Sequence, residues 1–121
     1  MKRILLADDQ KAVRRALRLL LEQEANCTIA GEVQDSGALL AAVESGSADL
    51  VLLDWELPGL EIERLLPLSN GKGARIRIIA MSSRPEARVA ALAAGVDAWI
   101  SKGKPAEEVL ETIDRVVGDE A

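Results

Sequence analysis

Short apolar runs alternate strictly with segments of helical periodicity along this chain, and that alternation limits its fold more than any other feature. Most of the runs are rich in leucine or β-branched residues and nearly continuous, as strands are when both faces of their sheet are covered. The predicted strands are residues 3–7, 27–33, 49–53, 75–81 and 98–101. Strict strand–helix alternation predicts a (βα)5 fold, in which a doubly wound, parallel five-stranded sheet carries helices on both faces.

Five helices are expected, over residues 10–24, 36–45, about 61–69, about 85–94 and 105–117. Asp35 or Ser36 is placed to cap the start of the second helix. Pro67 and the Asn70-Gly71 turn signal interrupt or end the third helix. Gly95 is suited to the C-cap of the fourth.

Length and composition exclude several classes of protein. The 121 residues show no repeat or linker, so we expect a single domain over residues 1–121. The formal charge of −5 opposes non-specific binding to nucleic-acid phosphates. With no histidine and only Cys27, the chain lacks Ser-His-Asp and Cys-His nucleophiles, nearly every zinc site and any intramolecular disulfide. The apolar run before Asp8 is too short for a signal peptide or a membrane span, which indicates a cytoplasmic protein.

Polar residues suited to phosphate chemistry follow four of the five predicted strands. Ligands of open parallel sheets bind beyond the carboxyl ends of the strands, so these residues are site candidates. They are Asp8, Asp9, Asp54, Ser82, Ser83 and Lys102. Neighbouring carboxylates repel one another unless a hard cation such as Mg²⁺ is bound. A hydroxyl and an ammonium beside that cation supply what phosphoryl transfer needs, with Asp54 as the nucleophile.

In the order and spacing of these residues, the sequence resembles the receiver domain of two-component response regulators over essentially its whole length. The matching motifs are Asp8-Asp9, Asp54 followed by Leu57-Pro58-Gly59, Met81-Ser82-Ser83, and the stretch from Gly95 to Lys102. The resemblance implies a flavodoxin-like fold with sheet order 2-1-3-4-5. Residues 81–105 are most similar to receivers that precede nitrate-response-type DNA-binding domains.

The resemblance also implies roles at a Mg²⁺ (or Mn²⁺) site. Asp9 would bind the cation directly and Asp8 largely through water. Asp54 would be both ligand and phosphoacceptor, and the backbone carbonyl of Glu56 would complete the protein's ligands. Ser82 is expected to be the switch hydroxyl that moves toward the phosphoryl group.

Other residues are implied to assist or tune the site. Trp99 occupies the place of the family's switch aromatic, although packing in the core is an equal alternative. Ser83 lies where the family prefers a small residue. Glu56 and Arg84 flank the entrance and are expected to tune dephosphorylation, by an ion pair that slows attack by water. The equal alternative is that Glu56 and Arg84 are two solvated side chains.

The sequence departs from the family pattern near its lysine. The spacing from Trp99 identifies Lys102 as the active-site lysine, but Gly103 follows it where the family usually has proline, often after a cis bond. A cis bond without proline costs several kcal/mol, so the geometry of this peptide is left open. Lys104-Pro105 resembles the missing pair at the wrong spacing. Ile62 replaces an expected glycine, so the third helix is expected to start differently.

Simpler structural roles compete with these interpretations. Asp8, Asp9 and Asp54 could be loop acids that cap helices, and Asp9 is well placed to cap the first helix. Ser82 or Ser83 could cap the fourth helix. A basic set on the first helix is either a solvated face, which is the default, or part of a docking face for a kinase. That set is Lys11, Arg14, Arg15 and Arg18.

The function that these features predict is phosphorelay signalling, in which a partner phosphohistidine donates its phosphoryl group to Asp54. The expected partner is a sensor histidine kinase or a phosphotransfer protein. A homodimer is allowed, while direct binding to nucleic acid or membrane is not expected. Such a domain catalyses only its own modification and hydrolysis. The alternatives are a phosphorylation-independent interaction module and an aspartate-dependent phosphohydrolase, for which Glu56 is the wrong residue type and the chain has no room for a cap.

Overall fold

A single parallel sheet with helices on both faces forms the protein, and it confirms the predicted fold class and strand order. The computed structural model describes residues 1–69 and 75–118. The sheet order is β2-β1-β3-β4-β5. The strands are β1 Lys2–Ala7, β2 Cys27–Val33, β3 Leu50–Asp54, β4 Arg77–Ser82 and β5 Ala98–Ser101. The helices are α1 Lys11–Glu22, α2 Ser36–Glu44, α3 Ile62–Ser69, α4 Ala87–Ala94 and α5 Ala106–Gly118.

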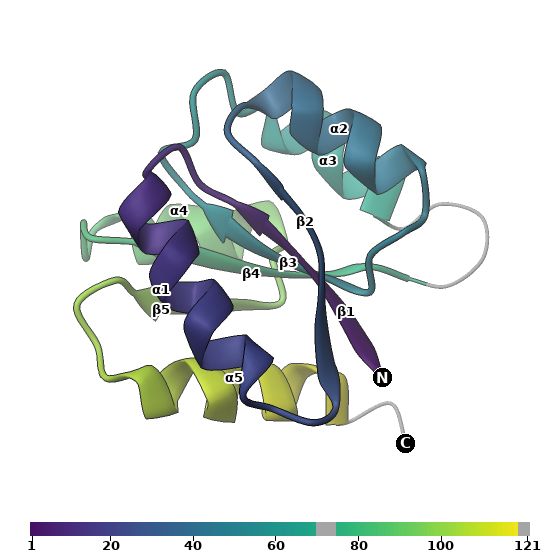
Figure 1. Cartoon of the computed structure of the whole chain (residues 1–121). Coiled ribbons are helices and arrows are strands. Elements are labelled where there is room, and N and C mark those ends of the chain that lie inside the picture. Colours follow the sequence, from purple (N-terminus) through teal and green to yellow (C-terminus); the bar gives the residue numbers. More distant parts are fainter. Residues whose placement is uncertain (70–74, 119–121) are drawn as a thin grey trace.

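Two aliphatic layers hold the helices against the sheet. Figure 1 shows α1 and α5 on one side of the sheet and α2 and α3 on the other. Successive strand residues serve opposite layers: Leu52 packs toward α1 and α5, while Leu53 packs toward α2, α3 and α4. Every residue of β3 is buried, and full burial of one leucine contributes about 1.5–3 kcal/mol. The central strand is therefore a fixed platform whose last residue is Asp54.

Helix ends agree with the local sequence signals, with one exception. Asp35 caps α2 by accepting a hydrogen bond from the backbone N–H of Ala38 at 2.9 Å. Gly95 ends α4 in the left-handed conformation, at φ 113°. The predicted end of α3 at Ser69 is confirmed, but Pro67 does not interrupt the helix. Pro67 is exposed and lies in the last turn, where it removes a single backbone hydrogen bond. The Asn70-Gly71 turn signal lies outside the described residues.

Two aspartates stabilise the amino-terminal edge of the sheet by hydrogen bonds and ion pairs. Asp49, just before β3, accepts the backbone N–H of Arg3 at 2.8 Å and pairs with the guanidinium of Arg3 at 2.9 Å. Asp97, just before β5, accepts the backbone N–H of Ile78 at 2.8 Å and pairs with two arginines, Arg75 and Arg77. Each carboxylate thus satisfies a strand N–H group and is neutralised by a cation.

None of the helices in the described ranges is both long and apolar enough to cross a membrane.

Candidate functional site

The opposite, carboxyl-terminal edge of the sheet gathers three carboxylates from two strand ends. Asp8 follows β1, Asp9 comes next, and Asp54 ends β3. One oxygen from each of Asp8, Asp9 and Asp54 lies within 4.8 Å of the others. Asp8 and Asp54 are each 3% exposed, whereas Asp9 faces solvent. The predicted acidic cluster therefore forms, with an oxygen-only donor set that fits a hard divalent cation reached from solvent.

Lys102 brings a cation into this cluster from the end of β5. Its Nζ lies 2.9 Å from Asp8 Oδ2 and 3.3 Å from Asp54 Oδ1. The backbone N–H of Lys102 donates to the carbonyl of Ser82 at 3.0 Å, which fixes the loop against β4. The described residues contain no cis peptide bond, so the Lys102–Gly103 bond is trans. The spacing argument thus placed the correct lysine beside the aspartates.

The described part of the cluster has more carboxylates than cations, because three carboxylates lie together and Lys102 pairs with two of them, Asp8 and Asp54. Burial is the largest influence on Asp54 and raises its pKa, and the charge of Asp8 adds to that rise. The backbone N–H of Glu56 and the ammonium of Lys102 oppose it. For Lys102, burial lowers the pKa, but its hydrogen bond and charge interaction with Asp8, and those with Asp54, outweigh burial and raise it. Lys102 therefore stays charged, and ionisation of Asp54 costs more than that of an ordinary aspartate.

Asp8 and Asp54 make the same local turn. Asp8 Oδ1 accepts the backbone N–H of Gln10, and Asp54 Oδ1 accepts that of Glu56, both at 2.9 Å. The alternative that Asp9 caps α1 was wrong: the N-cap is Gln10, with no side-chain cap hydrogen bond. The reason is that Asp8 already holds the turn, which leaves the carboxylate of Asp9 exposed at the site.

Ser82 lies at the end of β4 and is fully buried, at 0% exposure. Its hydroxyl lies 2.9 and 3.0 Å from the two carboxylate oxygens of Glu56, to which it donates. It also accepts the backbone N–H of Arg84 at 3.0 Å. The alternative that Ser82 or Ser83 caps α4 was wrong, because the N-cap is Glu86 and makes no side-chain cap hydrogen bond.

The predicted ion pair between Glu56 and Arg84 does not form in the described structure. Arg84 instead pairs with Glu86, with its Nε 3.3 Å from Oε1 of that residue. Glu56 is held by Ser82, because β3 and β4 pair in parallel with Asp54 opposite Met81. Beyond that register the backbone N–H of Trp55 donates to the carbonyl of Met81 at 2.8 Å, which keeps Glu56 beside the end of β4. Sequence reasoning had assigned Glu56 to the site entrance and Ser82 to the switch, but it missed the contact between them.

Comparison with known proteins decides the family. A family model described as the response regulator receiver domain matches residues 4–114. The chain belongs to this family. A receiver domain is a signalling domain of two-component systems and not a classical enzyme, which removes the support for a phosphohydrolase.

Individual relatives agree with this assignment. The nitrate/nitrite response regulator NarL of Escherichia coli K12 is 29% identical over 119 residues, covering 97% of this chain and 55% of NarL. The KDP operon regulator KdpE of the same strain is 33% identical over 103 residues, covering 84% of this chain and 45% of KdpE. The chain spans about half the length of the curated relatives it matches.

Solved structures share both fold and sequence with this receiver. A LuxR-family DNA-binding response regulator from Staphylococcus aureus superposes with a TM-score of 0.82 at 26% identity, covering 96% of this chain and 98% of that one. A LuxR-family two-component response regulator from Aurantimonas gives 0.85 at 25% identity, covering 98% and 86%. The chain is thus similar in sequence to a nitrate/nitrite response regulator and in structure to two LuxR-family regulators.

The predicted switch aromatic, Trp99, and the predicted tuning residue Ser83 make no contact with the carboxylate cluster among the described interactions. Trp99 on β5 is half-buried and packs against the aliphatic layer beneath α2, α3 and α4. Its ring Nε1 is buried and has no hydrogen-bond partner among the described residues. Ser83 is exposed. The core-packing interpretation describes Trp99 in this conformation, and its movement on phosphorylation stays a prediction.

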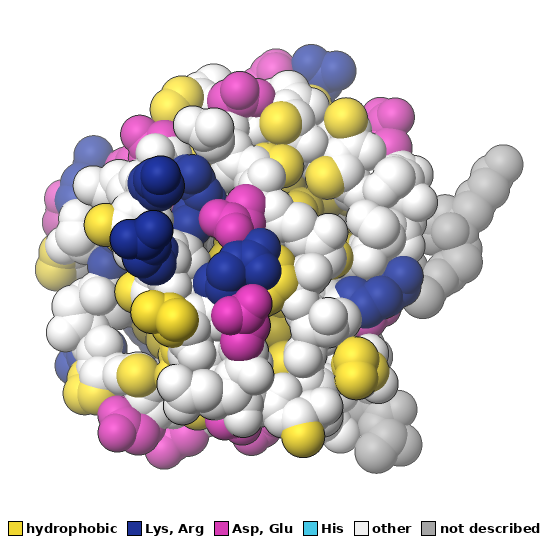
Figure 2. All heavy atoms as spheres, in the orientation of Figure 1, with side chains coloured by type: hydrophobic (Ala, Val, Ile, Leu, Met, Phe, Trp, Pro, Cys, Tyr) yellow, Lys and Arg dark blue, Asp and Glu magenta, His cyan; other side chains and the backbone are white. Residues whose placement is uncertain are grey.

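The basic set on α1 divides into two pairs. Arg14 and Arg18 both bind the carboxylate of Glu32 on β2, at 3.0 and 2.7 Å. Hydrogen bonds from these two arginines lower the pKa of Glu32, and the bond from Arg18 has the largest effect. Lys11 and Arg15 are exposed. Figure 2 shows basic side chains clustered on the face that carries α1, with acidic groups among them. Lys11 and Arg15 are therefore the members of this set that are most exposed to a partner.

Proposed function

We propose that this receiver accepts a phosphoryl group on Asp54 from a partner's phosphohistidine, with Mg²⁺ or Mn²⁺ bound, in a cytoplasmic phosphorelay. One observation carries the proposal: Asp54 is 3% exposed at the end of β3, within the carboxylate cluster and 3.3 Å from the ammonium of Lys102. Strand-end placement, a cation site and a fixed ammonium are together what phosphoryl transfer to a carboxylate requires.

The cation would be held by oxygen atoms alone. Asp9 and Asp54 would supply direct carboxylate ligands, Asp8 would act largely through water, and the backbone carbonyl of Glu56 would complete the set. A bound divalent cation neutralises charge on these carboxylates and on the incoming phosphoryl oxygens. The excess of carboxylates over ammonium groups supports this proposal, because a cation relieves their repulsion.

Within the site each side chain has a distinct task. Asp54 Oδ1 is engaged by the N–H of Glu56 and by Lys102, so Oδ2 is the oxygen that we assign to attack phosphorus. A P–O bond to Asp54 forms as the P–N bond of the donor breaks, with its electron pair returning to the imidazole. Lys102 neutralises charge on the transferred group, and Ser82 donates its hydroxyl to it afterwards.

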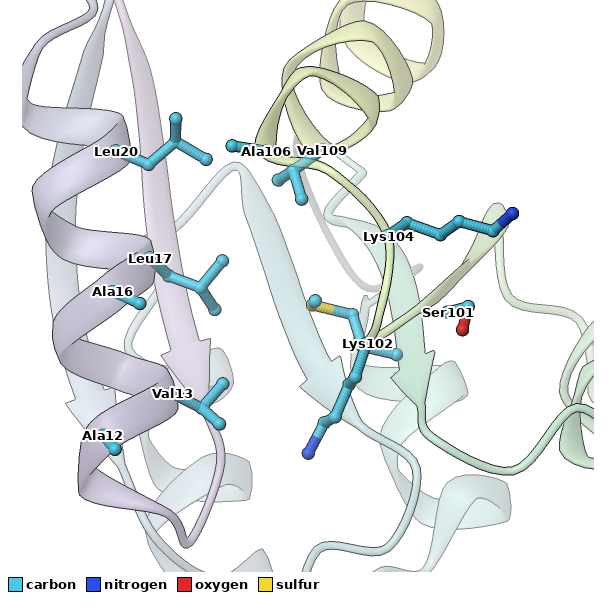
Figure 3. A pocket seen from close by; sticks show the side chains of 11 residues that line it. Ala12, Val13, Ala16, Leu17, Leu20, Ser101, Lys102, Lys104, Ala106 and Val109 are labelled. Carbon is cyan, nitrogen blue, oxygen red and sulfur yellow. The ribbon is translucent and has the colours of Figure 1, made fainter.

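The donor is proposed to be a histidine kinase or a phosphotransfer protein that docks beside α1. A cavity of about 350 Å³ lies between α1 and α5, next to Lys102. Figure 3 shows Val13, Leu17 and Leu20 of α1 on one side of this hollow and Val109 of α5 and Lys102 on the other, while Lys104 points away from α1. Exposed Lys11 and Arg15 line a neighbouring hollow on α1, which shares Ala12 and Ala16 with this cavity, and they suit an acidic rim on the partner. A homodimer is compatible with this role, which involves no direct contact of the domain with nucleic acid or membrane.

The test uses a small phosphodonor in place of the partner. The chain is incubated with acetyl phosphate and Mg²⁺, and its intact mass and peptide map are recorded. We expect one phosphoryl group, located on Asp54, and none in Asp54→Asn. Asp49→Asn, which changes an aspartate at the other edge of the sheet, should be phosphorylated like the wild type. An unmodified wild-type chain would overturn the proposal in favour of a phosphorylation-independent interaction module.

A further inference from the structure

The hydroxyl of Ser82 is engaged by Glu56 in this unphosphorylated conformation, and that contact has a consequence for switching. We infer that Glu56 is a positioning residue that holds Ser82 away from the phosphoryl site and thereby sets how readily the domain enters its phosphorylated conformation. This inference rests on the proposed phosphorylation of Asp54. It concerns a regulatory role of the Glu56 side chain, distinct from the metal ligand that its backbone carbonyl would provide.

The argument begins with the number of protons on the hydroxyl. Ser82 Oγ has one hydrogen, which it donates to Glu56 at 2.9–3.0 Å, and it already accepts the N–H of Arg84 at 3.0 Å. To donate to a phosphoryl oxygen on Asp54, it must give up the carboxylate. The hydrogen bond to Glu56 and a hydrogen bond to the phosphoryl group are therefore mutually exclusive, so a favourable bond to Glu56 disfavours the bond to the phosphoryl group.

Burial makes this competition asymmetric. Ser82 is 0% exposed, so its hydroxyl has no access to bulk water in exchange for Glu56. Glu56 is exposed, and its carboxylate can be solvated once released. Breaking the hydrogen bond between Ser82 and Glu56 therefore costs free energy, unless a phosphoryl oxygen replaces the carboxylate as the acceptor.

Charge acts in the same direction once a phosphoryl group is present. Glu56 lies two residues after Asp54, and its backbone N–H already donates to Asp54 Oδ1 at 2.9 Å. A phosphoryl group on Asp54 adds negative charge near a second negative group. Arg84 does not neutralise Glu56, because its guanidinium is paired with Glu86. Phosphorylation would thus attract the hydroxyl and repel the carboxylate that holds it.

A double-mutant cycle with a phosphoryl mimic tests the inference. The affinity for beryllofluoride is measured at saturating Mg²⁺, with tryptophan fluorescence as the signal, in the full chain. Glu56→Ala should tighten binding about 10-fold, the size expected for a hydrogen bond to a charged group. Glu56→Gln keeps a neutral acceptor and should give an intermediate gain. Glu63→Ala, which removes an equal charge from the exposed start of α3, should leave the affinity unchanged.

The decisive comparison is made in a Ser82→Ala background, where no hydroxyl remains to be held. There Glu56→Ala should have little effect on beryllofluoride affinity. An equal gain with and without the Ser82 hydroxyl would show a general charge effect and would overturn the inference while leaving the proposed function intact. Failure of the wild type to bind beryllofluoride with Mg²⁺ would instead overturn the proposed function, and the inference with it.

Discussion

The two edges of the sheet use aspartate in opposite ways. At the amino-terminal edge, Asp49 and Asp97 each accept a strand N–H and are paired with arginine. At the carboxyl-terminal edge, Asp8, Asp9 and Asp54 lie together, and Lys102 pairs with Asp8 and Asp54 but not, among the described contacts, with Asp9. The residue type and its position beside a strand end are the same at both edges. The difference lies in charge balance.

This difference separates a structural role from a functional one. A neutralised carboxylate that holds backbone N–H groups stabilises the fold, and replacing it costs stability. A buried carboxylate is costly to ionise, and burial, with the charge of Asp8 added, raises the pKa of Asp54. That unbalanced charge is what a divalent cation would neutralise, so the edge that weakens the fold is the edge we assign to function.

The largest expected effect contrasts the two edges directly. Asp97→Ala should lower the free energy of unfolding by about 2–3 kcal/mol, because it removes the acceptor of the Ile78 N–H and the ion pair with Arg75. Urea denaturation measures the loss. Asp9→Asn, at the opposite edge, serves as the matched variant and should cause no loss in metal-free buffer. An equal decrease in the free energy of unfolding in Asp97→Ala and Asp9→Asn would contradict the different roles of the two edges.

Replacement of the proposed phosphoacceptor, Asp54, should change the free energy of unfolding by a smaller amount and in the opposite direction. Asp54→Asn keeps an oxygen that can accept the N–H of Glu56 but removes repulsion from Asp8. In metal-free buffer it should raise the free energy of unfolding by about 1 kcal/mol. Asp49→Asn is the control and should lower it. A clear loss of stability in Asp54→Asn would mean that Lys102 already balances the cluster.

The pH dependence of stability should also differ in sign. The pKa of Asp49 is lowered, chiefly by its hydrogen bond from Arg3, so its contribution is present above the ordinary aspartate pKa and is lost as pH falls through the lowered value. The pKa of Asp54 is raised, so its contribution is present at low pH and is lost as pH rises through the raised value.

Urea unfolding in metal-free buffer between about pH 3 and pH 7 checks both signs. The advantage of wild type over Asp49→Asn should shrink toward the acid end. The advantage of Asp54→Asn over wild type should grow as pH rises. Parallel curves for the two variants would refute the assignment of opposite roles.

Salt concentration should have the smallest effect on the free energy of unfolding, and the effect should again have opposite signs for the Asp49 and Asp54 carboxylates. Added NaCl screens the partly exposed Arg3–Asp49 pair and so should reduce the stability advantage of wild type over Asp49→Asn. Added NaCl should also screen the repulsion between the carboxylates around Asp9, and so reduce the amount by which Asp54→Asn is more stable than wild type. Stability measured at low and high NaCl tests this, and a common shift in all three proteins would show that salt does not distinguish the edges.

Much of this arrangement was predictable from the sequence, because periodicity and strand-end position are local signals. The run ending in Asp54 predicted a buried strand, and the spacing from Trp99 selected Lys102 over Lys104. Local patterns do not decide which of several nearby partners a side chain chooses. Glu56 binds Ser82 and not Arg84 because the register of β3 against β4 places the hydroxyl closer, and that register is a long-range property.

The helix ends show the same limit. Asp35 was predicted as a cap because its own sequence neighbours supply the N–H group that it accepts. Asp9 was a plausible cap until the turn made by Asp8 occupied that role. Pro67 was expected to break α3, yet its position in the last turn makes the cost of the missing hydrogen bond small.

Mg²⁺-dependent stability tests the central claim most directly. Urea unfolding is measured with and without saturating Mg²⁺ for wild type, Asp54→Asn and Asp49→Asn. At roughly 100 times its dissociation constant, Mg²⁺ should raise the free energy of unfolding of wild type and Asp49→Asn by about 2.7 kcal/mol. Asp54→Asn should gain much less. An unchanged wild type, or an equal gain in Asp54→Asn, would contradict the assignment of the carboxyl-terminal edge as a cation-dependent phosphoacceptor site.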